Sequence, residues 1–346
     1  MEPSRLRHIA ACLAAVLFAA NAAGCENTHQ NGPQEPLIGI DLPRTDTDFW
    51  RAYAGYLTEE QARTGARIAA TTTSQGDAGK LAANLDAFER GGTKALVVSP
   101  QQTQHLDLTL DSLFARGITV VSVDARPESG TVFMVVRADN RAYGTKACEY
   151  LGAQLAGKGK VVELQGSQES INGFERSEAF AHCMRTKFPG ITVIALPTEW
   201  KADIAEQELR AALAREKNVN GLYLQAGGVF LEPVLAVLRE KGLLKPAGQA
   251  GHIGIVSNDG TPQELDAIRS GEIDATVSQP ADLYAKYALY YAREGAVGRH
   301  FSPGPTDHGS VIVALPNGLE DQLPAPLVTR DNVDDPALWA NRRATR

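Results

Sequence analysis

Short aliphatic runs recur along this 346-residue chain, and each ends on a polar side chain before a helix-like stretch begins. Near-continuous Val, Ile and Leu runs are typical of parallel strands buried on both faces, and the amphipathic stretches between them are typical of crossover helices. In open α/β sheets, ligands bind just beyond the carboxyl ends of the strands. The pattern therefore predicts an α/β fold in which polar strand ends surround a bound molecule. The strand ends are Asp41, Ser99, Asp124, Gln165, Gln225 and Asp259.

Two series of alternating strands and helices follow each other, which predicts two domains of similar architecture. A closed eight-stranded barrel is the alternative on strand count, but the stretch from Asp124 to Arg137 lacks a helix and breaks the alternation. In the first series we expect strands at 37–41, 65–70, 95–99, 118–124 and 131–136, with helices beginning at Thr47 or Asp48, at Asp77 and at Gln102. In the second we expect helices at 140–156, 170–187, 202–216, 229–241, 262–269 and 281–294, and strands at 160–165, 191–196, 221–225, 252–257 and 273–278.

The N-terminus has the pattern of an export signal. Arg5 and Arg7 precede an apolar run at 9–20 that is too short to span a bilayer as a stable helix. Residues 22–25, Ala-Ala-Gly-Cys, match a lipoprotein cleavage box, so we expect a signal peptide at 1–24 and a lipid on Cys25. Residues 25–36 then form a tether. The alternative is an ordinary secretory signal with an incidental cysteine. Either way we expect an exported protein, and in the lipidated case a periplasmic or cell-surface protein anchored to a membrane.

Charge and cysteine usage narrow the function further. The formal charge is −7, and loss of residues 1–24, with two Arg and one Glu, leaves −8. No basic stripe remains, which argues against nucleic acid as a partner.

Cys148 and Cys183 both fall in helix-like stretches. In an oxidising compartment they could form a disulfide, or they could be two small buried hydrophobic residues.

The chain lacks the motifs of common enzyme classes. Its seven histidines are scattered, and neither an HExxH pair, a zinc-spaced Cys/His cluster nor a GxSxG elbow is present. The glycine-rich stretch 152–159 ends in Gly where a P-loop has Ser or Thr, and it lies after a helix rather than before one. Acid–base chemistry by Asp124 and Asp259 is the remaining enzymatic alternative. We therefore predict a binding protein that uses no metal and no cofactor.

Eight short segments in order resemble type I periplasmic sugar-binding proteins, the ribose- and galactose-binding kind that serves ABC importers. The resemblance runs from about Leu37 to Ile312. The segments are TDTDFW (45–50), LVVSP (96–100), VSVDAR (121–126), ADN (138–140), ELQG (163–166), ERSEAF (175–180), NDGTP (258–262) and ATVSQP (275–280). The resemblance implies two Rossmann-like lobes with parallel sheets, joined by a three-segment hinge. It places the crossings near 137–140, 279–281 and 308–312, the N-terminal lobe at 37–138 plus 281–308, and the C-terminal lobe at 139–280 plus 309–346.

The resemblance also implies a ligand site between the lobes. Flat aromatic rings match the apolar faces of a sugar, and carboxylates, amides and guanidinium groups match its hydroxyls. The residues that match the family pattern are the aromatics Phe49, Trp50 and Trp200, the acids Asp124 and Asp259, Arg176, and Gln279 at a crossing. The alternatives are core rings, solvated loop acids and a surface ion pair.

Other positions depart from the ribose-binding pattern. Thr47 and Ser99 replace Asn residues, and Asp41 replaces a small polar residue, so all three remain candidate ligand contacts. Ala125 replaces an Arg, although Arg126 could reach the site. The segment Ala226-Gly227-Gly228 replaces an Asn-Asp pair after Gln225, which removes two polar side chains and indicates extra space. These departures favour a sugar or polyol other than ribose.

The implied mechanism is closure of the two lobes of a monomer on its ligand, followed by recognition by an ABC permease. A receptor subunit that signals to a membrane sensor kinase or chemoreceptor binds sugar by the same closure, and the sequence leaves that alternative open.

Overall fold

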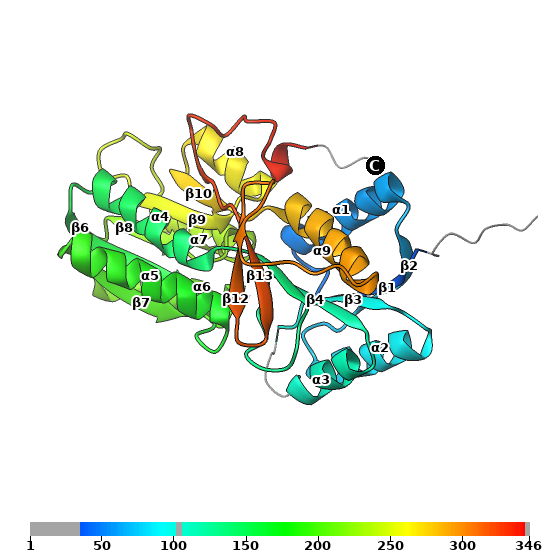
Figure 1. Cartoon of the computed structure of the whole chain (residues 1–346). Helices are drawn as coiled ribbons and strands as arrows, with labels where there is room; N and C mark the ends of the chain where they lie inside the picture. Colours follow the sequence, from blue (N-terminus) through cyan, green and yellow to red (C-terminus); the bar gives the residue numbers. More distant parts are fainter. Residues whose placement is uncertain (1–34, 102–105, 343–346) are drawn as a thin grey trace, which may run out of the picture. The chain divides into compact units, whose positions relative to one another are not determined.

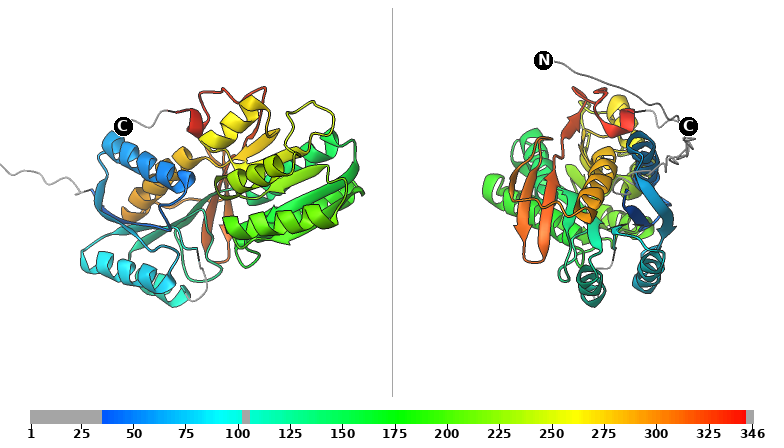
Figure 2. Two further views of the ribbon diagram at one scale, coloured as in Figure 1. Left: turned by 180° about the vertical axis from the view of Figure 1, so that it is seen from behind. Right: turned by 45° about the vertical axis from the view of Figure 1, so that its right-hand side comes forward.

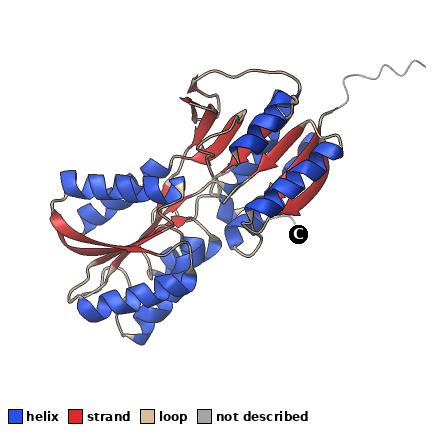
Figure 3. Ribbon diagram, turned by 90° about the horizontal axis from the view of Figure 1, so that it is seen from below, coloured by secondary structure: helices blue, strands red, loops and turns tan. Residues whose placement is uncertain are grey.

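The computed structural model describes residues 35–101 and 106–342, whose strands form two open sheets with helices on both faces (Figures 1 and 3). The eight-stranded sheet has the order β11-β12-β13-β5-β4-β3-β1-β2, and the six-stranded sheet has the order β14-β10-β9-β8-β6-β7. The eight-stranded sheet and its helices are called lobe 1, and the six-stranded sheet and its helices are called lobe 2. The strands form two open sheets, so the alternative of a closed eight-stranded barrel is wrong. The expected signal peptide, Cys25 and most of the tether lie outside the described residues.

Lobe 1 follows the predicted strand–helix alternation. Its elements are β1 (Leu37–Leu42), α1 (Asp48–Thr64), β2 (Arg67–Thr73), α2 (Ala78–Arg90), β3 (Ala95–Val98), α3 (Asp107–Ala115), β4 (Thr119–Val123), β5 (Met134–Ala138), α9 (Ala281–Ala296), β11 (Gly304–Pro305), β12 (Val311–Leu315) and β13 (Gly318–Leu323). The helix expected from Gln102 begins at Asp107. Alternate residues of a strand point to opposite faces of the sheet. Val97 and Val121 pack against α1 and α9 on one face. Leu96 and Val120 pack against α2 and α3 on the other.

Lobe 2 is built in the same way. Its elements are α4 (Asn140–Gln154), β6 (Lys158–Gln165), α5 (Ile171–Lys187), β7 (Gly190–Pro197), α6 (Ala202–Arg215), β8 (Gly221–Leu224), α7 (Gly227–Glu240), β9 (Gly254–Asp259), α8 (Pro262–Ser270), β10 (Ala275–Ser278), β14 (Leu327–Thr329) and the 3₁₀ turn η1 (Trp339–Asn341). Helices α4 and α5 cover one face of the sheet, and α6, α7 and α8 cover the other. Within residues 35–101 and 106–342, no helix combines the length and apolarity needed to cross a membrane.

Within the described residues, the chain passes between the sheets at three places, and the third differs from the expectation. The first two lie between β5 and α4 and between β10 and α9. The third was expected near 308–312 but lies at 324–326, because β12 and β13 form a hairpin that stays in lobe 1, where β13 pairs with β5. Pro324 and Pro326 have no backbone N–H to donate to a sheet, so the ladder ends there.

The C-terminal segment contacts both lobes (Figures 1 and 2). Trp339 packs edge-on against Phe49 of α1 at 6.1 Å, and its carbonyl accepts a hydrogen bond from the Tyr56 hydroxyl at 2.6 Å. Its indole N–H donates to the backbone oxygen of Asp259 in lobe 2 at 3.2 Å. Arg269 of α8 holds the same segment through Asp334. The tail therefore joins the two lobes beside the second crossing.

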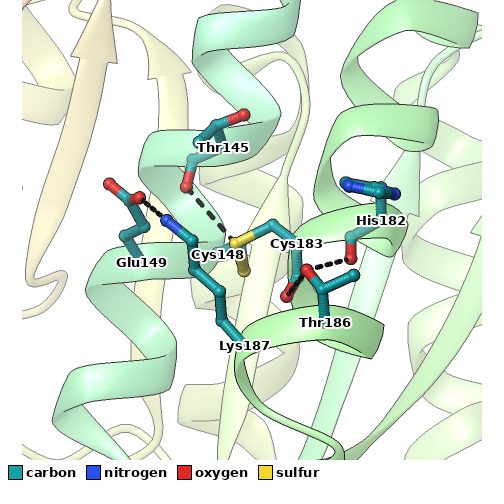
Figure 4. The surroundings of a disulfide bond; sticks show 7 residues. All are labelled: Thr145, Cys148, Glu149, His182, Cys183, Thr186 and Lys187. Atoms are coloured by element: carbon teal, nitrogen blue, oxygen red, sulfur yellow. Dashed lines mark hydrogen bonds and ion pairs between the residues drawn. A yellow bond between two sulfur atoms is a disulfide. The ribbon is translucent and has the colours of Figure 1, made fainter.

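A disulfide joins α4 to α5, the pairing that the sequence left open (Figure 4). The bonded residues are Cys148 and Cys183, both buried, with their Cα atoms 6.2 Å apart. Lys187 and Glu149 form an ion pair between the same two helices. Gly144 brings the helices close, since a Cβ there would overlap the backbone oxygen of Arg176. The covalent bond thus reinforces a helix pair that already packs tightly.

We expect removal of this disulfide to lower the free energy of unfolding. The cross-link closes a loop with a sequence separation of 35. Loop-closure entropy for such a loop corresponds to about 2–4 kcal/mol. Urea unfolding of the native protein, with and without reductant, should show this loss, and a Cys148→Ala, Cys183→Ala double variant should reproduce it. Reductant should leave the double variant unaffected. Equal midpoints for native and double-variant protein would contradict the prediction.

Candidate functional site

Two acids, the buried Asp259 and the half-buried Asp124, stand at the carboxyl ends of strands in different lobes. Asp124 follows β4 in lobe 1, and Asp259 is the last residue of β9 in lobe 2. Their φ angles are 66° and 106°, a region that non-glycine residues rarely enter. Such strain persists only where the surrounding structure enforces it, and it is concentrated at functional sites. The fold therefore holds both predicted acids in conformations that they would not adopt alone.

Arg176 of α5 supplies the positive charge near these acids. Its Nε donates to Asn140 Oδ1 at 2.6 Å, its Nη2 donates to Gln279 Oε1 at 3.1 Å, and its Nη1 donates to the backbone oxygen of Gln225. The side chain is buried, with its guanidinium 4.7 Å from the centre of the Tyr143 ring. The predicted arginine is therefore held by three separate elements rather than by a surface ion pair.

Gln279 and Asn172 connect the lobes at Asp124. Gln279 lies in the second crossing, and its Nε2 donates to Asp124 Oδ1 at 3.1 Å. Asn172 of α5 donates to Asp124 Oδ2 at 3.2 Å, and its own oxygen accepts from Arg137 Nη2 at 2.7 Å. Arg137 also pairs with Glu175 at 2.8 Å. Asp124, Arg176 and Gln279, all predicted from sequence, thus form one connected group that spans both lobes.

Burial makes the carboxylates of this site costly to ionise. Desolvation raises the pKa of Asp124, and the charge of Arg176 lowers it only in part. Desolvation also raises the pKa of Asp259, with a further increase from the nearby Glu264 carboxyl. Asp259 Oδ2 accepts a hydrogen bond from the Gly228 backbone N–H at 3.0 Å, at the start of α7. Additional donors would therefore stabilise the ionised form of both acids.

The predicted aromatic residues occupy two different environments. Phe49 and Trp50 are buried in the hydrophobic core of lobe 1, where Phe49 meets Tyr284 edge-on at 5.9 Å. Trp200 is half-buried, at a φ of 58°, and its ring is parallel to that of Phe230 at 6.5 Å. The Arg176 guanidinium lies 5.5 Å from the Trp200 ring centre. Only Trp200 of the three thus lies beside the charged group.

The remaining candidates have separate surroundings. Thr47 caps α1, since its Oγ1 accepts from the Trp50 backbone N–H at 3.3 Å. Asp41 is buried, and its Oδ1 accepts from Thr72 at 2.7 Å and from Asn84 at 2.6 Å. Its Oδ2, like the buried Oγ of Ser99, has no hydrogen-bond partner among the described residues. Asp41 Oδ2 therefore retains capacity to accept a hydrogen bond, and the Ser99 hydroxyl to donate or accept one.

The space expected at 226–228 is partly filled by protein. A Cβ at Gly227 would overlap the Glu264 carboxyl and lie 2.5 Å from the backbone oxygen of Asn258. A Cβ at Gly228 would lie 3.3 Å from Asp259 Oδ2. Glycine at 227 is therefore required by the buried Glu264, and a side chain at 228 would crowd the Asp259 carboxyl.

A family model described as "Periplasmic binding protein domain" matches residues 38–299. The chain belongs to this family. The matched relatives are binding proteins rather than enzymes, as the sequence predicted. In the described ranges, 35–101 and 106–342, His, Cys, Asp and Glu side chains form no group of three or more that could hold a metal ion.

Two relatives and one solved structure illustrate the similarity. A xylitol-binding protein from Mycolicibacterium smegmatis is 27% identical over 268 residues, which cover 76% of this chain and 68% of the relative. A ribose import binding protein from Bacillus subtilis is 22% identical over 262 residues, which cover 75% and 82%. An ABC transporter solute-binding protein from Bacillus halodurans with bound myo-inositol has a TM-score of 0.75 at 16% identity, covering 89% of this chain and 99% of that one. The last similarity establishes the fold.

Sequence reasoning missed several polar residues of this periplasmic binding protein. Asn172 lies four residues before Arg176, on the same helix face, which was a usable signal. Glu264 was detectable only as the third residue of a capping box with Thr261, and nothing in that motif revealed its approach to Asp259. The approach of Glu264 to Asp259 became visible only in the folded lobe 2.

Stability should fall as the pH rises from about 5 to about 8. Burial raises the pKa of Glu163, on β6, from 4.5 to about 8, and hydrogen bonds from Gln225 and Gln165 lower it only in part. The folded protein therefore keeps a proton that the unfolded chain releases, so this contribution is complete below pH 4.5 and is lost as the pH rises through about 8. Glu163→Gln should flatten the dependence in urea unfolding across this range. The exposed Asp203→Asn is the control, and an unchanged slope in Glu163→Gln would disprove the assignment.

Proposed function

We propose that this chain is an exported solute-binding protein that captures a sugar or sugar-like polyol between its two lobes and delivers it to the permease of an ABC importer. The observation that carries the proposal is the pair of strained strand-end acids, Asp124 and Asp259, contributed by different lobes around the buried Arg176. The names of the xylitol- and ribose-binding relatives and the bound myo-inositol of the structural neighbour support a ligand rich in hydroxyls.

The chemistry of the site suits such a ligand. An ionised carboxylate accepts two bonds from adjacent hydroxyls, and each such donor offsets the burial that raises the pKa of Asp124 and Asp259. The Arg176 guanidinium donates to ring or hydroxyl oxygens. The Trp200 ring provides a flat surface for the apolar C–H face of a sugar. On Asp124, ligand hydroxyls would replace the amide donors of Asn172 and Gln279.

Closure of the lobes fits the contacts between them. Asp124 accepts from Asn172 across the lobes, Arg137 pairs with Glu175, and Asp48 of α1 accepts from Gln263 of α8. In the proposed cycle, opening breaks these bonds and exposes the acids. Ligand binding then bridges the lobes, and the closed monomer presents a combined surface to the permease.

Binding should be detectable as thermal stabilisation. A ligand that binds only the folded state raises its stability by mass action, by about 2.7 kcal/mol at 100 times the dissociation constant. A panel of ribose, D-allose, D-apiose, xylitol, glycerol and myo-inositol should raise the Tm for a narrow subset, confirmed by calorimetry. A folded protein with no shift for any member of the panel would refute the proposed ligand class.

Substitution of Asp259 or Trp200 should weaken binding of the ligand. Asp259→Asn and Trp200→Ala should each weaken binding of the best panel compound by about 10- to 100-fold, the loss expected for a charge-assisted bond or a stacked ring. Asp203→Asn, on the exposed face of α6, is the matched control. Full affinity in the Asp259→Asn variant would remove this residue from the site.

We also propose that Cys25 becomes the lipidated N-terminus after removal of residues 1–24, so that residues 25–36 tether the protein to a membrane. Cys25→Ala should then abolish incorporation of labelled palmitate and release the protein from the membrane fraction. Ligand binding by the released protein should be unchanged. Labelled lipid on the variant would show that another residue carries the anchor.

A further inference from the structure

Two tyrosine hydroxyls near the candidate site have no hydrogen-bond partner among residues 35–101 and 106–342. Tyr53 of α1 and Tyr143 of α4 are both 0% exposed, and neither hydroxyl has a hydrogen-bond partner among the described residues. A buried polar group left without a bond destabilises the folded protein, and native structures keep few of them. A fold that retains two such groups requires a reason for each.

Unpartnered hydroxyls are not a general feature of the buried tyrosines in the described part of the chain. Tyr56 donates to the Trp339 carbonyl at 2.6 Å, and Tyr291 donates to Asp321 at 3.0 Å. Tyr223 accepts from Asn258 at 3.0 Å, and Tyr284 accepts from the Ala138 backbone N–H at 2.8 Å. The lack of a hydrogen-bond partner therefore reflects the positions of Tyr53 and Tyr143 in the fold and not a general property of buried tyrosines.

The charges of the acids act on both phenols, one in each lobe. Tyr53 lies one turn beyond Phe49 on α1 of lobe 1, and after burial the charge of Asp124 is what raises its pKa. Tyr143 of lobe 2 lies against the Arg176 guanidinium, and the charges of Asp259 and Asp124 both add to the effect of burial on its pKa. Each phenol therefore stays protonated and can donate its hydrogen.

Other buried atoms at or next to strand ends also lack hydrogen-bond partners among the described residues. Asp41 Oδ2, Ser99 Oγ and Asn258 Oδ1 are buried and unpartnered among the described residues. Asp41 and Ser99 stand at or after the ends of β1 and β3 in lobe 1, and Asn258 precedes Asp259 in lobe 2. Unpartnered donors and acceptors thus occur together at the strand ends of both lobes.

We propose that Tyr53 and Tyr143 are specificity-determining ligand contacts, which donate their hydroxyls to the ligand from opposite lobes across from the two carboxylates. Each ligand hydroxyl can then donate to an acid and accept from a phenol. This inference rests on the proposed function and deepens it. It selects a compact polyol or sugar with hydroxyls directed to both lobes.

The test uses substitutions that delete one oxygen atom. Tyr53→Phe and Tyr143→Phe should each raise the Tm of the unliganded protein by roughly 2–6 °C, because each removes a buried group without a partner. Each should also weaken binding of the best panel compound, among ribose, D-allose, D-apiose, xylitol, glycerol and myo-inositol, by about 5- to 20-fold. Tyr291→Phe is the matched control: it loses a bond to the buried Asp321, so its Tm should fall while its affinity stays unchanged.

Three results would overturn the inference, and they are distinguishable. A fall in Tm for both tyrosine variants, as in Tyr291→Phe, would show that the hydroxyls make structural bonds. A raised Tm with unchanged affinity would remove both tyrosines from the ligand contacts and leave the proposed function intact. Absence of binding by the native protein would reject the proposed function itself, and this inference with it.

Discussion

The buried guanidinium of Arg176 is the group on which the arrangement of the site depends. A charge removed from water needs hydrogen-bond partners, and each of the three Arg176 side-chain nitrogens has one, from Asn140, Gln279 and the Gln225 carbonyl. Its position on α5 is set by the close approach of α4, which only a glycine at 144 permits. The disulfide between the same helices reinforces that spacing. Helix packing within lobe 2 therefore fixes the cation that balances Asp124 and Asp259.

The same cation connects the site to the relative position of the lobes. Gln279 lies in the second crossing and bonds to both Arg176 and Asp124, so a change in the crossing moves groups of both lobes at once. Trp339 adds a second link, since it packs against Phe49 in lobe 1 and donates to the Asp259 carbonyl in lobe 2. The proposed ligand contacts and the lobe contacts thus share residues, which is the condition for binding energy to drive the proposed closure.

Local sequence patterns predicted most of the strands and helices, and they singled out the two acids, because strand-end polarity and helix caps are short-range signals. The helix expected to begin at Asp77, for example, is α2, and the Asp77 carboxylate caps it by accepting from the Lys80 backbone N–H at 2.7 Å. The third crossing was placed wrongly because the pairing of β13 with β5 joins residues far apart in the chain. Tyr53 and Tyr143 escaped notice for a related reason. An unpartnered hydroxyl is a property of the assembled interior, and the sequence around a tyrosine does not record it.

Several features of the site destabilise the protein, so the surrounding structure must hold them in place. Asp259 shows how this is done. Its backbone φ is 106°. The capping box formed by Thr261 and Glu264 at the start of α8 fixes the backbone just after Asp259. The Gly228 N–H binds its carboxyl, and the Trp339 indole binds its carbonyl. Each constraint comes from a different element, and none occupies the whole carboxyl group. The residue is therefore immobilised through its backbone while its carboxyl group keeps capacity to accept further hydrogen bonds, as a preformed acceptor for ligand hydroxyls requires.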